Sequence, residues 1–338
     1  MSAAVPSSST PEPSIVTLQS HILQQQTRDP EASGAFSWIL SALSISAKMI
    51  AAHVRRARLD DVLGTVGQQN VQGEQQQKLD VIANEILLRT LGGREGVAIV
   101  ASEENDEPVI LRSDDSNERK YCVLFDPLDG SSNLDICGAV GTIFSILRKD
   151  RRSPKAEESL LQCGTEQVAA GYVLYGSSTV FVLSIGLGVD MFVLDPNYGA
   201  FIRVAEGLRI PNTNKCYSVN EGNRASFPQG YQNYLNWAQE QGYSSRYVGA
   251  MVADVHRILL QGGVFMYPPT KKAPKGKLRL MYEANPMAML IEQAGGKALC
   301  APGQRILEVK PTDIHQRCSV IIGSGDEVDH VARHVSGG

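Results

Sequence analysis

A series of short apolar runs between residues 97 and 194 limits what this chain can fold into. Each run has the length of a β-strand and is bounded by turn-forming or charged residues, which is typical of buried strands. The runs are Val97–Ala101, Tyr121–Phe125, Thr142–Arg148, Val168–Tyr175, Thr179–Ile185 and Met191–Leu194. Together they predict a sheet of several adjacent strands.

Helical spacing of apolar residues flanks this predicted sheet on both sides. We expect helices at Phe36–Leu63, Lys78–Leu91, Phe227–Gln241, Ala250–Gln261, 285–295 and Asp326–Val335, and strands at Val264–Tyr267 and Ser319–Gly323. Asn285 is expected to cap its helix, with Pro286 at the first helical position. The polar stretch Gly64–Gln77 is predicted to be a mobile loop, and Asp150–Glu158 a charged surface loop.

Alternating strands and helices place the chain in the α/β (α+β) class. Its 338 residues correspond to roughly two domains. We expect an N-terminal domain over residues 15–205 and a C-terminal domain over residues 206–338. The Ser- and Pro-rich segment 1–14 is predicted to be disordered.

Composition excludes several classes of protein. The net charge of −4 argues against a general nucleic-acid binder, and the absence of about 18 consecutive apolar residues argues against a membrane span. No secretory signal is recognisable, so the cytoplasm is the expected location; a plastid or other organelle stays open, because a mature chain can have lost its leader. The six cysteines form no CxxC pair and are predicted to be reduced, buried thiols.

The segment Tyr121–Asp135, YCVLFDPLDGSSNLD, carries the clearest chemical signal. An apolar strand delivers Asp126, and Asp129 follows on a turn stiffened by proline, so two carboxylates are placed to grip a hard divalent cation. The Gly-Ser-Ser turn at 130–132 exposes N–H groups and hydroxyls of the kind that bind phosphate. The alternative interpretation is an ordinary Asp-Pro turn capped by a second Asp.

Further acids strengthen the chemical interpretation. Glu103 and Glu104 follow another apolar strand, and Asp80 opens a helix shortly after Glu74. Glu283 lies late in the chain, in LRLMYEANP. Like charges that converge repel one another unless cations compensate them. Acids of this kind beside a phosphate-binding turn indicate metal-assisted phosphoryl chemistry.

Beyond these patterns, the sequence resembles the class I fructose-1,6-bisphosphatases, within the magnesium-dependent, lithium-sensitive sugar-phosphatase superfamily. The matching runs are NVQGEQQQKLD (70–80), SEE (102–104), FDPLDGSSN (125–133), VGTIFSI (140–146), VAAGYVLYGSS (168–178), YSVNEG (217–222), SRYVGAMVADVHR (245–257), GKLRLMYEANPMA (276–288) and PTDIHQR (311–317). The resemblance implies a layered αβαβα fold with two sheets sandwiched between helices. It also implies hydrolysis of the 1-phosphate of D-fructose 1,6-bisphosphate, in gluconeogenesis or a sugar-phosphate cycle.

The same resemblance implies a metal site for Mg²⁺, with Mn²⁺ able to substitute. Its ligands are Glu103, Asp126, Asp129, Glu283 and the carbonyl of Leu128. Glu74, Asp80 and Glu104 surround it, where they hold a further cation or position and deprotonate the attacking water. The family commonly has Asp at the position of Glu74, so the reach of this carboxylate differs.

The substrate contacts implied by the resemblance fall into two groups. The 1-phosphate lies near Asp129, Gly130, Ser131 and Ser132. The sugar and the 6-phosphate meet Asn220, Tyr247, Met251, Tyr267 and Lys277, and Arg279 is placed to point into the same site. Arg246 reaches across from a neighbouring subunit, which implies a homotetramer. Asn223 stands where the family usually has Tyr, which removes one hydroxyl contact.

Regulation by AMP is left open by the sequence. Lys120, Tyr121 and Arg148 match cationic and aromatic positions of the family's AMP site, whereas the run 33–36, Ser-Gly-Ala-Phe, replaces the usual Thr-Gly-Glu-Leu. No cysteine-bearing insertion follows Arg148, so thioredoxin control of the plastid type is not expected. Two alternatives to the fructose enzyme remain: a sedoheptulose-1,7-bisphosphatase or dual-specificity enzyme, and a catalytically silent homologue that acts as a regulator.

Overall fold

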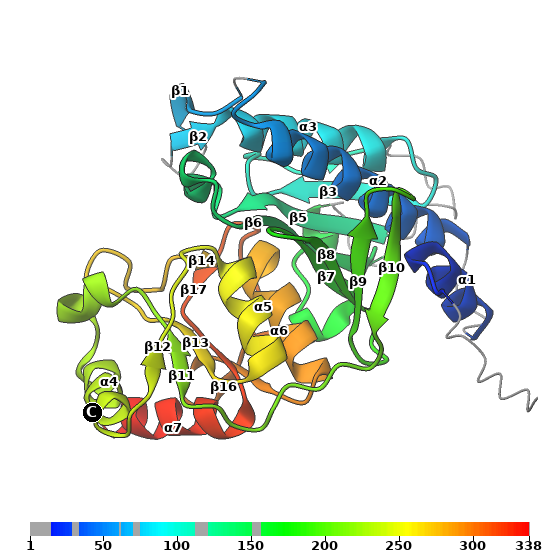
Figure 1. Cartoon of the computed structure of the whole chain (residues 1–338). Coiled ribbons are helices and arrows are strands. Elements are labelled where there is room, and N and C mark those ends of the chain that lie inside the picture. Colours follow the sequence, from blue (N-terminus) through cyan, green and yellow to red (C-terminus); the bar gives the residue numbers. More distant parts are fainter. Residues whose placement is uncertain are drawn as a thin grey trace, which may run out of the picture.

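In this computed structural model, the described residues form two large β-sheets, two short strand pairs and three layers of helices (Figure 1). The structure describes residues 15–28, 34–60, 62–69, 75–111, 121–150 and 157–337. The predictions for segment 1–14, Glu74 and Lys120 lie outside these residues. The predicted layered α/β class is confirmed, in the order helices, large sheet, helices, small sheet, helices.

The large sheet has eight strands in the order β10-β9-β8-β7-β6-β5-β3-β4. The strands are β3 (Val97–Ser102), β4 (Val109–Ile110), β5 (Tyr121–Asp129), β6 (Val140–Arg148), β7 (Gln167–Tyr175), β8 (Thr179–Ser184), β9 (Asp190–Asp195) and β10 (Ala200–Ala205). All six strands predicted in this region form, whereas β4 and β10 were not predicted. β5 and β6 are buried on both faces, which explains why the sequence shows them as continuous apolar runs.

The small sheet has six strands in the order β12-β11-β13-β18-β15-β16. They are β11 (Cys216–Ser218), β12 (Ser244–Ser245), β13 (Val264–Tyr267), β15 (Lys297–Ala301), β16 (Gln304–Arg305) and β18 (Val320–Gly323). The short strands β14 (Leu278–Arg279) and β17 (Arg317–Cys318) pair separately. The strands predicted at β13 and β18 are therefore confirmed.

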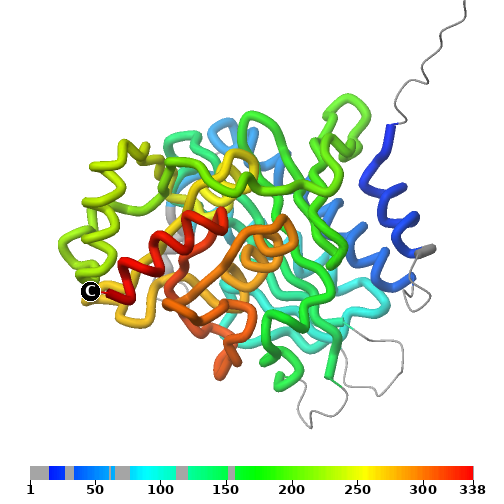
Figure 2. Tube along the Cα trace, turned by 90° about the horizontal axis from the view of Figure 1, so that it is seen from below, coloured from blue at the N-terminus to red at the C-terminus, as the bar shows by residue number. Residues whose placement is uncertain are grey.

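Helices form the three remaining layers. They are α1 (Leu18–Arg28), α2 (Gly34–Arg56), α3 (Lys78–Gly92), α4 (Gln229–Glu240), α5 (Met251–Gln261), α6 (Asn285–Gln293) and α7 (Gly325–Ser336). α1, α2 and α3 share an apolar core with one face of the large sheet, and α5 and α6 lie between the two sheets. α4 and α7 pack side by side on the outer face of the small sheet, far from α1 (Figures 1 and 2).

Three predictions about local structure were wrong. The stretch Gly64–Gln77 is not simply a loop, because β1 (Thr65–Gln69) and β2 (Gln75–Gln77) pair in an antiparallel sheet. A polar hairpin held by backbone hydrogen bonds needs no apolar periodicity, so no pattern signalled it. The helix predicted over Phe36–Leu63 ends at Arg56. Asn285 does not cap α6, because the chain is already helical before it, in a π-helical turn.

Among the described helices, α2 has the length and composition that would allow it to cross a membrane, which the sequence analysis did not anticipate. Its buried residues include Ile39, Leu43 and Ile50, which belong to the core shared with the large sheet. In this structure, the apolar composition of α2 serves the packing of a core helix.

Close packing at Gly171 in β7 provides a test of the fold. A Cβ at this position would lie 2.4 Å from Cζ of Phe144 and 2.6 Å from the Val182 carbonyl oxygen. We expect Gly171→Ala to destabilise the protein by about 1–3 kcal/mol, measured as the change in the free energy of unfolding. Gly93→Ala is the control, because the nearest atom there is 3.9 Å away and φ is −82°. Equal thermal unfolding midpoints for the two variants would contradict the close packing around Gly171.

Candidate active site

The parallel pairing of β3 and β5 brings two groups of acids to one edge of the large sheet. Parallel strands have their carboxyl ends at the same edge, so Glu103 and Glu104, after β3, lie beside the acids at the end of β5. The N–H of Glu103 donates to the Phe125 carbonyl at 3.0 Å, which extends the pairing into the acidic segment. The convergence expected from the sequence is therefore produced by strand register.

The Asp-Pro turn at the end of β5 is held by hydrogen bonds from both sides. Oδ1 of Asp126 accepts from the N–H of Leu128 at 3.0 Å. The hydroxyl of Thr142 on β6 donates to the Pro127 carbonyl at 2.8 Å. Because all of these atoms are buried, the turn has little freedom to change its conformation.

Two other carboxylates approach this turn from separate elements. Oδ2 of Asp129 accepts from the N–H of Val252 at 2.6 Å, in the first turn of α5, where the helix dipole favours negative charge. Glu283 lies in the π-helical turn Leu280–Ala284, and its Oε2 accepts from the N–H of Arg279 at 2.6 Å. π-Helical turns occur frequently at functional sites.

The carboxylates of Asp126, Asp129 and Glu283 fit a divalent cation. Each offers an oxygen, and these oxygens lie within 4.8 Å of one another. Hard oxygen donors at this spacing suit Mg²⁺ or Mn²⁺. Glu103 lies close to the same group, because its charge repels those of Asp126 and Glu283. Leu128, whose carbonyl was predicted as a ligand, lines the same cavity.

Arg279 lies among the acids. Its Nη2 lies 2.7 Å from Oε1 of Glu103, and both side chains are buried, at 5% and 8% exposure. The sequence analysis grouped Arg279 with the contacts to the distal phosphate, and the structure places it at the acidic end of the cavity. A buried guanidinium here offsets part of the repulsion among the carboxylates.

Burial and mutual repulsion disfavour the ionised form of these carboxylates. Burial raises the pKa of Glu103 to about 7, with opposing attraction from Arg279 and added repulsion from Glu283. Burial likewise raises the pKa of Asp129 to about 7, against the hydrogen bonds from the first turn of α5. The pKa of Asp126 is raised well above its ordinary value by burial and by the charges of Glu103 and Asp129.

Asp80 joins this group from the start of α3. Its Oδ2 accepts from the N–H of Gln77 at 2.8 Å, and its carboxylate interacts with the charges of Glu104 and Glu103. Burial, followed by repulsion from Glu104, raises the pKa of Asp80 to about 7. A carboxylate with this pKa beside a phosphate-binding turn is suited to accept a proton near neutral pH.

A cavity of about 630 Å³ connects the acids to a second polar region. The acidic end and the predicted phosphate turn contribute Glu103, Glu104, Asp126, Leu128, Asp129, Gly130, Ser131, Ser132, Arg279 and Glu283. The other end contributes Asn220, Tyr247, Met251, Tyr267 and Lys277. The structure thus brings together in one cavity all of the residues predicted for metal and substrate except Arg246.

Gly130 allows the phosphate turn to pack closely on the C-terminal half of the chain. Its φ is +75°, and a Cβ would lie 2.3 Å from Cβ of Ala250, just before α5. A side chain at this position would therefore push apart the phosphate turn and α5. Asn133 reinforces the contact, because its side chain donates to the carbonyls of Ala139 and Val248 at 3.2 and 3.3 Å.

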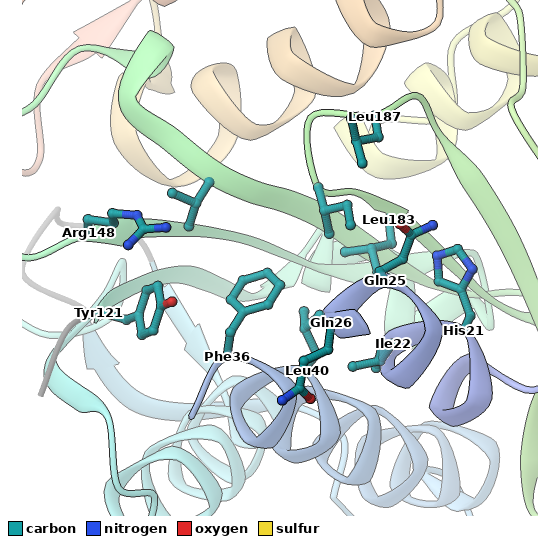
Figure 3. Close-up of a pocket in the computed structure, with 12 residues that line it drawn as sticks. His21, Ile22, Gln25, Gln26, Phe36, Leu40, Tyr121, Arg148, Leu183 and Leu187 are labelled. Atoms are coloured by element: carbon teal, nitrogen blue, oxygen red, sulfur yellow. The ribbon is translucent and has the colours of Figure 1, made fainter. Parts of the chain in front are cut away.

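Other predicted residues lie apart from this cavity. Arg246 is exposed, and its guanidinium donates to the Ser245 carbonyl at 2.8 Å. Tyr121 and Arg148 line a second cavity of about 140 Å³ between α1, α2 and the large sheet, with Arg148 near the Tyr121 ring (Figure 3). The sequence analysis did not name Gln77, Gly249, Phe265 or Leu278, which also line the main cavity. No chemical signal marks such residues, since they contribute backbone or apolar surface.

Comparisons with known proteins agree on one family. The profile of the fructose-1,6-bisphosphatase N-terminal domain matches residues 16–206, and that of the C-terminal domain matches residues 210–336. The chain is 48% identical over 323 residues to the class 1 fructose-1,6-bisphosphatase of Chlorobium chlorochromatii, covering 93% of this chain and 96% of that protein.

Solved structures lead to the same family. The crystal structure of Leishmania major fructose-1,6-bisphosphatase in the holo form is similar with a TM-score of 0.89 and 40% identity, over 95% of this chain and 99% of that one. The structure of the same enzyme in the T-state is similar with a TM-score of 0.85 and 39% identity, with the same coverage.

The raised carboxyl pKa values predict how pH affects stability without metal. Folded-state pKa values near 7 for Glu103 and Asp129 exceed the ordinary value of about 4, so the folded state binds more protons between these pH values. The site therefore lowers the free energy of unfolding progressively from about pH 4 to pH 7. In EDTA, Asp126→Asn should raise the thermal midpoint at pH 8 and have a much smaller effect at pH 4.5. A difference between variant and wild type that does not depend on pH would contradict this prediction.

Proposed function

The chain belongs to the fructose-1,6-bisphosphatase family, and on this premise we propose that it is a magnesium-dependent enzyme that releases the 1-phosphate of D-fructose 1,6-bisphosphate, giving fructose 6-phosphate and phosphate. The observation that carries the proposal is a single cavity with two unlike ends. One end gathers carboxylates beside a phosphate-binding turn, and the other offers Lys277 with hydroxyl and amide groups. A ligand with a phosphate at each end of a polar carbon chain matches this distribution.

The acidic end would hold the metal. Asp126, Asp129 and Glu283 supply the cluster of oxygens, and Glu103 adds a further carboxylate. When bound, divalent cations supply positive charge that stabilises the phosphoryl oxygens and the leaving oxygen and makes water more acidic. A bound cation would also remove the repulsion that raises the carboxyl pKa values.

The protein's own groups bind the reacting phosphate and accept the proton. Ser131 and Ser132, with the backbone N–H groups of their turn, face the cavity beside the metal ligands and are placed to bind phosphate oxygens. Asp80, whose carboxylate is buried near Glu104, or Glu104 itself then accepts the proton of the attacking water. In the metal-free site, burial raises the pKa of Asp80 to about 7.

The other end of the cavity would hold the sugar and its 6-phosphate. Lys277 supplies a positive charge, Tyr247 supplies a hydroxyl, and Asn220 supplies an amide. Met251, at the start of α5, would cover the sugar. Binding of the sugar and the 6-phosphate at this end holds the 1-phosphate beside the acids. The 1-phosphate is then already oriented for reaction with water.

Several features of the family extend the proposal. We propose a homotetramer in which the exposed Arg246 reaches the cavity of a neighbouring subunit. We further propose that the second cavity, with Tyr121 and Arg148, is a candidate AMP site, that Mn²⁺ substitutes for Mg²⁺, and that the enzyme acts in cytoplasmic gluconeogenesis or a sugar-phosphate cycle. Each of these stays a prediction to be tested separately.

A substrate panel tests the proposed function. We expect phosphate release from fructose 1,6-bisphosphate with Mg²⁺ and loss of release in EDTA, because the acid cluster then lacks its counter-charge. Asp126→Ala and Glu283→Ala should each lower kcat at least about 100-fold, while gel filtration shows the wild-type oligomer. Preference for sedoheptulose 1,7-bisphosphate would favour the alternative substrate. Release from neither substrate would overturn the proposal, and repeating the panel with AMP tests the second cavity.

Lys277 is predicted to act through binding. Lys277→Ala removes the positive charge from the end of the cavity away from the acids, so it should raise KM at least about tenfold and lower kcat by a much smaller factor. Steady-state kinetics at saturating Mg²⁺ separate the two constants. Lys275→Ala is the matched control, because this exposed lysine precedes Gly276 and does not line the cavity. A lower kcat with unchanged KM would place Lys277 at the reacting phosphate.

A further inference from the structure

Asp254 is a buried carboxylate that the proposed reaction does not use. It lies in the first turn of α5 and has no exposed surface. Oδ1 accepts from the hydroxyl of Ser218 at 2.8 Å and from the N–H of Val248 at 3.0 Å. Oδ2 accepts from the N–H of Gly249 at 3.1 Å. Burial raises the pKa of Asp254, and the three donors directed at its carboxylate oppose this shift by favouring the ionised form.

The donors that Asp254 receives belong to the two segments that form the distal end of the cavity. Ser218 ends β11, two residues before Asn220. Val248 and Gly249 directly follow Tyr247. Asp254 therefore joins the bases of the two segments whose side chains, Asn220 and Tyr247, line the distal end of the cavity.

The same short segment is also tied to the acidic end. The Val248 carbonyl accepts from the side chain of Asn133, which follows the phosphate turn. The N–H of Val252 donates to Asp129, one of the metal-site carboxylates. Residues 248–252 are thus held from two sides. Asp254 links them to Ser218 of the small sheet. Asn133 and Asp129 link them to the phosphate turn of the large sheet.

We propose that Asp254 is a positioning residue that sets the distance between the two phosphate-binding ends of the cavity. It holds Tyr247 and Asn220 at the separation from the metal cluster that a substrate with two phosphates requires. This inference rests on the proposed function, because it assumes that the distal end binds the second phosphate. It predicts that Asp254 matters for a bisphosphate and much less for a monophosphate ester that lacks the distal group.

Another buried carboxylate supplies a matched control. Glu327 at the start of α7 has no exposed surface and accepts from the N–H of Asn214 at 3.2 Å and from the hydroxyl of Tyr243 at 2.8 Å. It ties loops to the small sheet much as Asp254 does, and it does not line the cavity. Glu327→Gln should therefore cost stability in the same way without affecting the distance between the two ends.

The decisive comparison uses Asp254→Asn with two substrates. The amide keeps the shape of the carboxylate but places an NH₂ group against a backbone N–H, which breaks one of the hydrogen bonds to residues 248–249. We expect KM for fructose 1,6-bisphosphate to rise about tenfold or more with a smaller change in kcat. We expect kcat/KM for fructose 1-phosphate to stay within about twofold of wild type, because only the distal phosphate loses its contact.

Ser218→Ala keeps the inference testable if Asp254→Asn does not fold. It removes one donor from Asp254 and should raise KM for the bisphosphate in the same selective way by a smaller factor, and Ser218→Thr should restore it. Glu327→Gln should leave both substrates unchanged at a temperature where it is folded. An unchanged KM in the Asp254 and Ser218 variants, or an equal loss with both substrates, would overturn the role of Asp254. A wild-type enzyme inactive on the bisphosphate would instead overturn the proposed function.

Discussion

Repulsion among buried carboxylates is the constraint on which the arrangement around the main cavity depends. Glu103, Asp126, Asp129 and Glu283 gather where each is shielded from water, and burial alone would make their ionisation costly. The structure supplies partial compensation through Arg279, the first turn of α5 and backbone N–H groups. The raised carboxyl pKa values show that this compensation is incomplete without cations. A site of this kind favours bound divalent cations because their positive charge neutralises the remaining negative charge of the carboxylates.

The fold provides the rigidity that such a balance requires. Both faces of β5 are covered, so the strand that ends in Asp126 and Asp129 cannot relax away from its neighbours. α5 and α6 fill the space between the sheets, and the start of α5 meets the phosphate turn at Gly130. Because the large sheet positions Asp126 and Asp129 and segments beside the small sheet position Asn220 and Tyr267, the layer between the sheets fixes the distance between the two ends of the cavity.

The sequence predicted the elements that depend on local pattern. β5 and β6 are uninterrupted apolar runs because both of their faces are buried, and the acids stand out because they follow such runs directly. α1 was missed, since it combines a short apolar face with polar glutamines. The ion pair between Arg279 and Glu103 joins residues far apart in the chain, so neither spacing nor composition signals it. The π-helical turn that presents Glu283 also lacks a recognised sequence pattern.

The second cavity and the carboxylate cluster lie at opposite ends of the same pair of strands. Tyr121 and Arg148 face each other at one end of β5 and β6, and Asp126 pairs with Ile143 near the other. Five residue-to-residue steps along β5 lead from Tyr121 to Asp126, which is about 17 Å at the usual rise. A ligand at Tyr121 and Arg148 can change the chemistry only if it binds more tightly to one arrangement of these strands than to another. β5 is closely packed on both faces, so it cannot bend locally. The two arrangements would therefore differ by a shift of whole packed elements relative to one another.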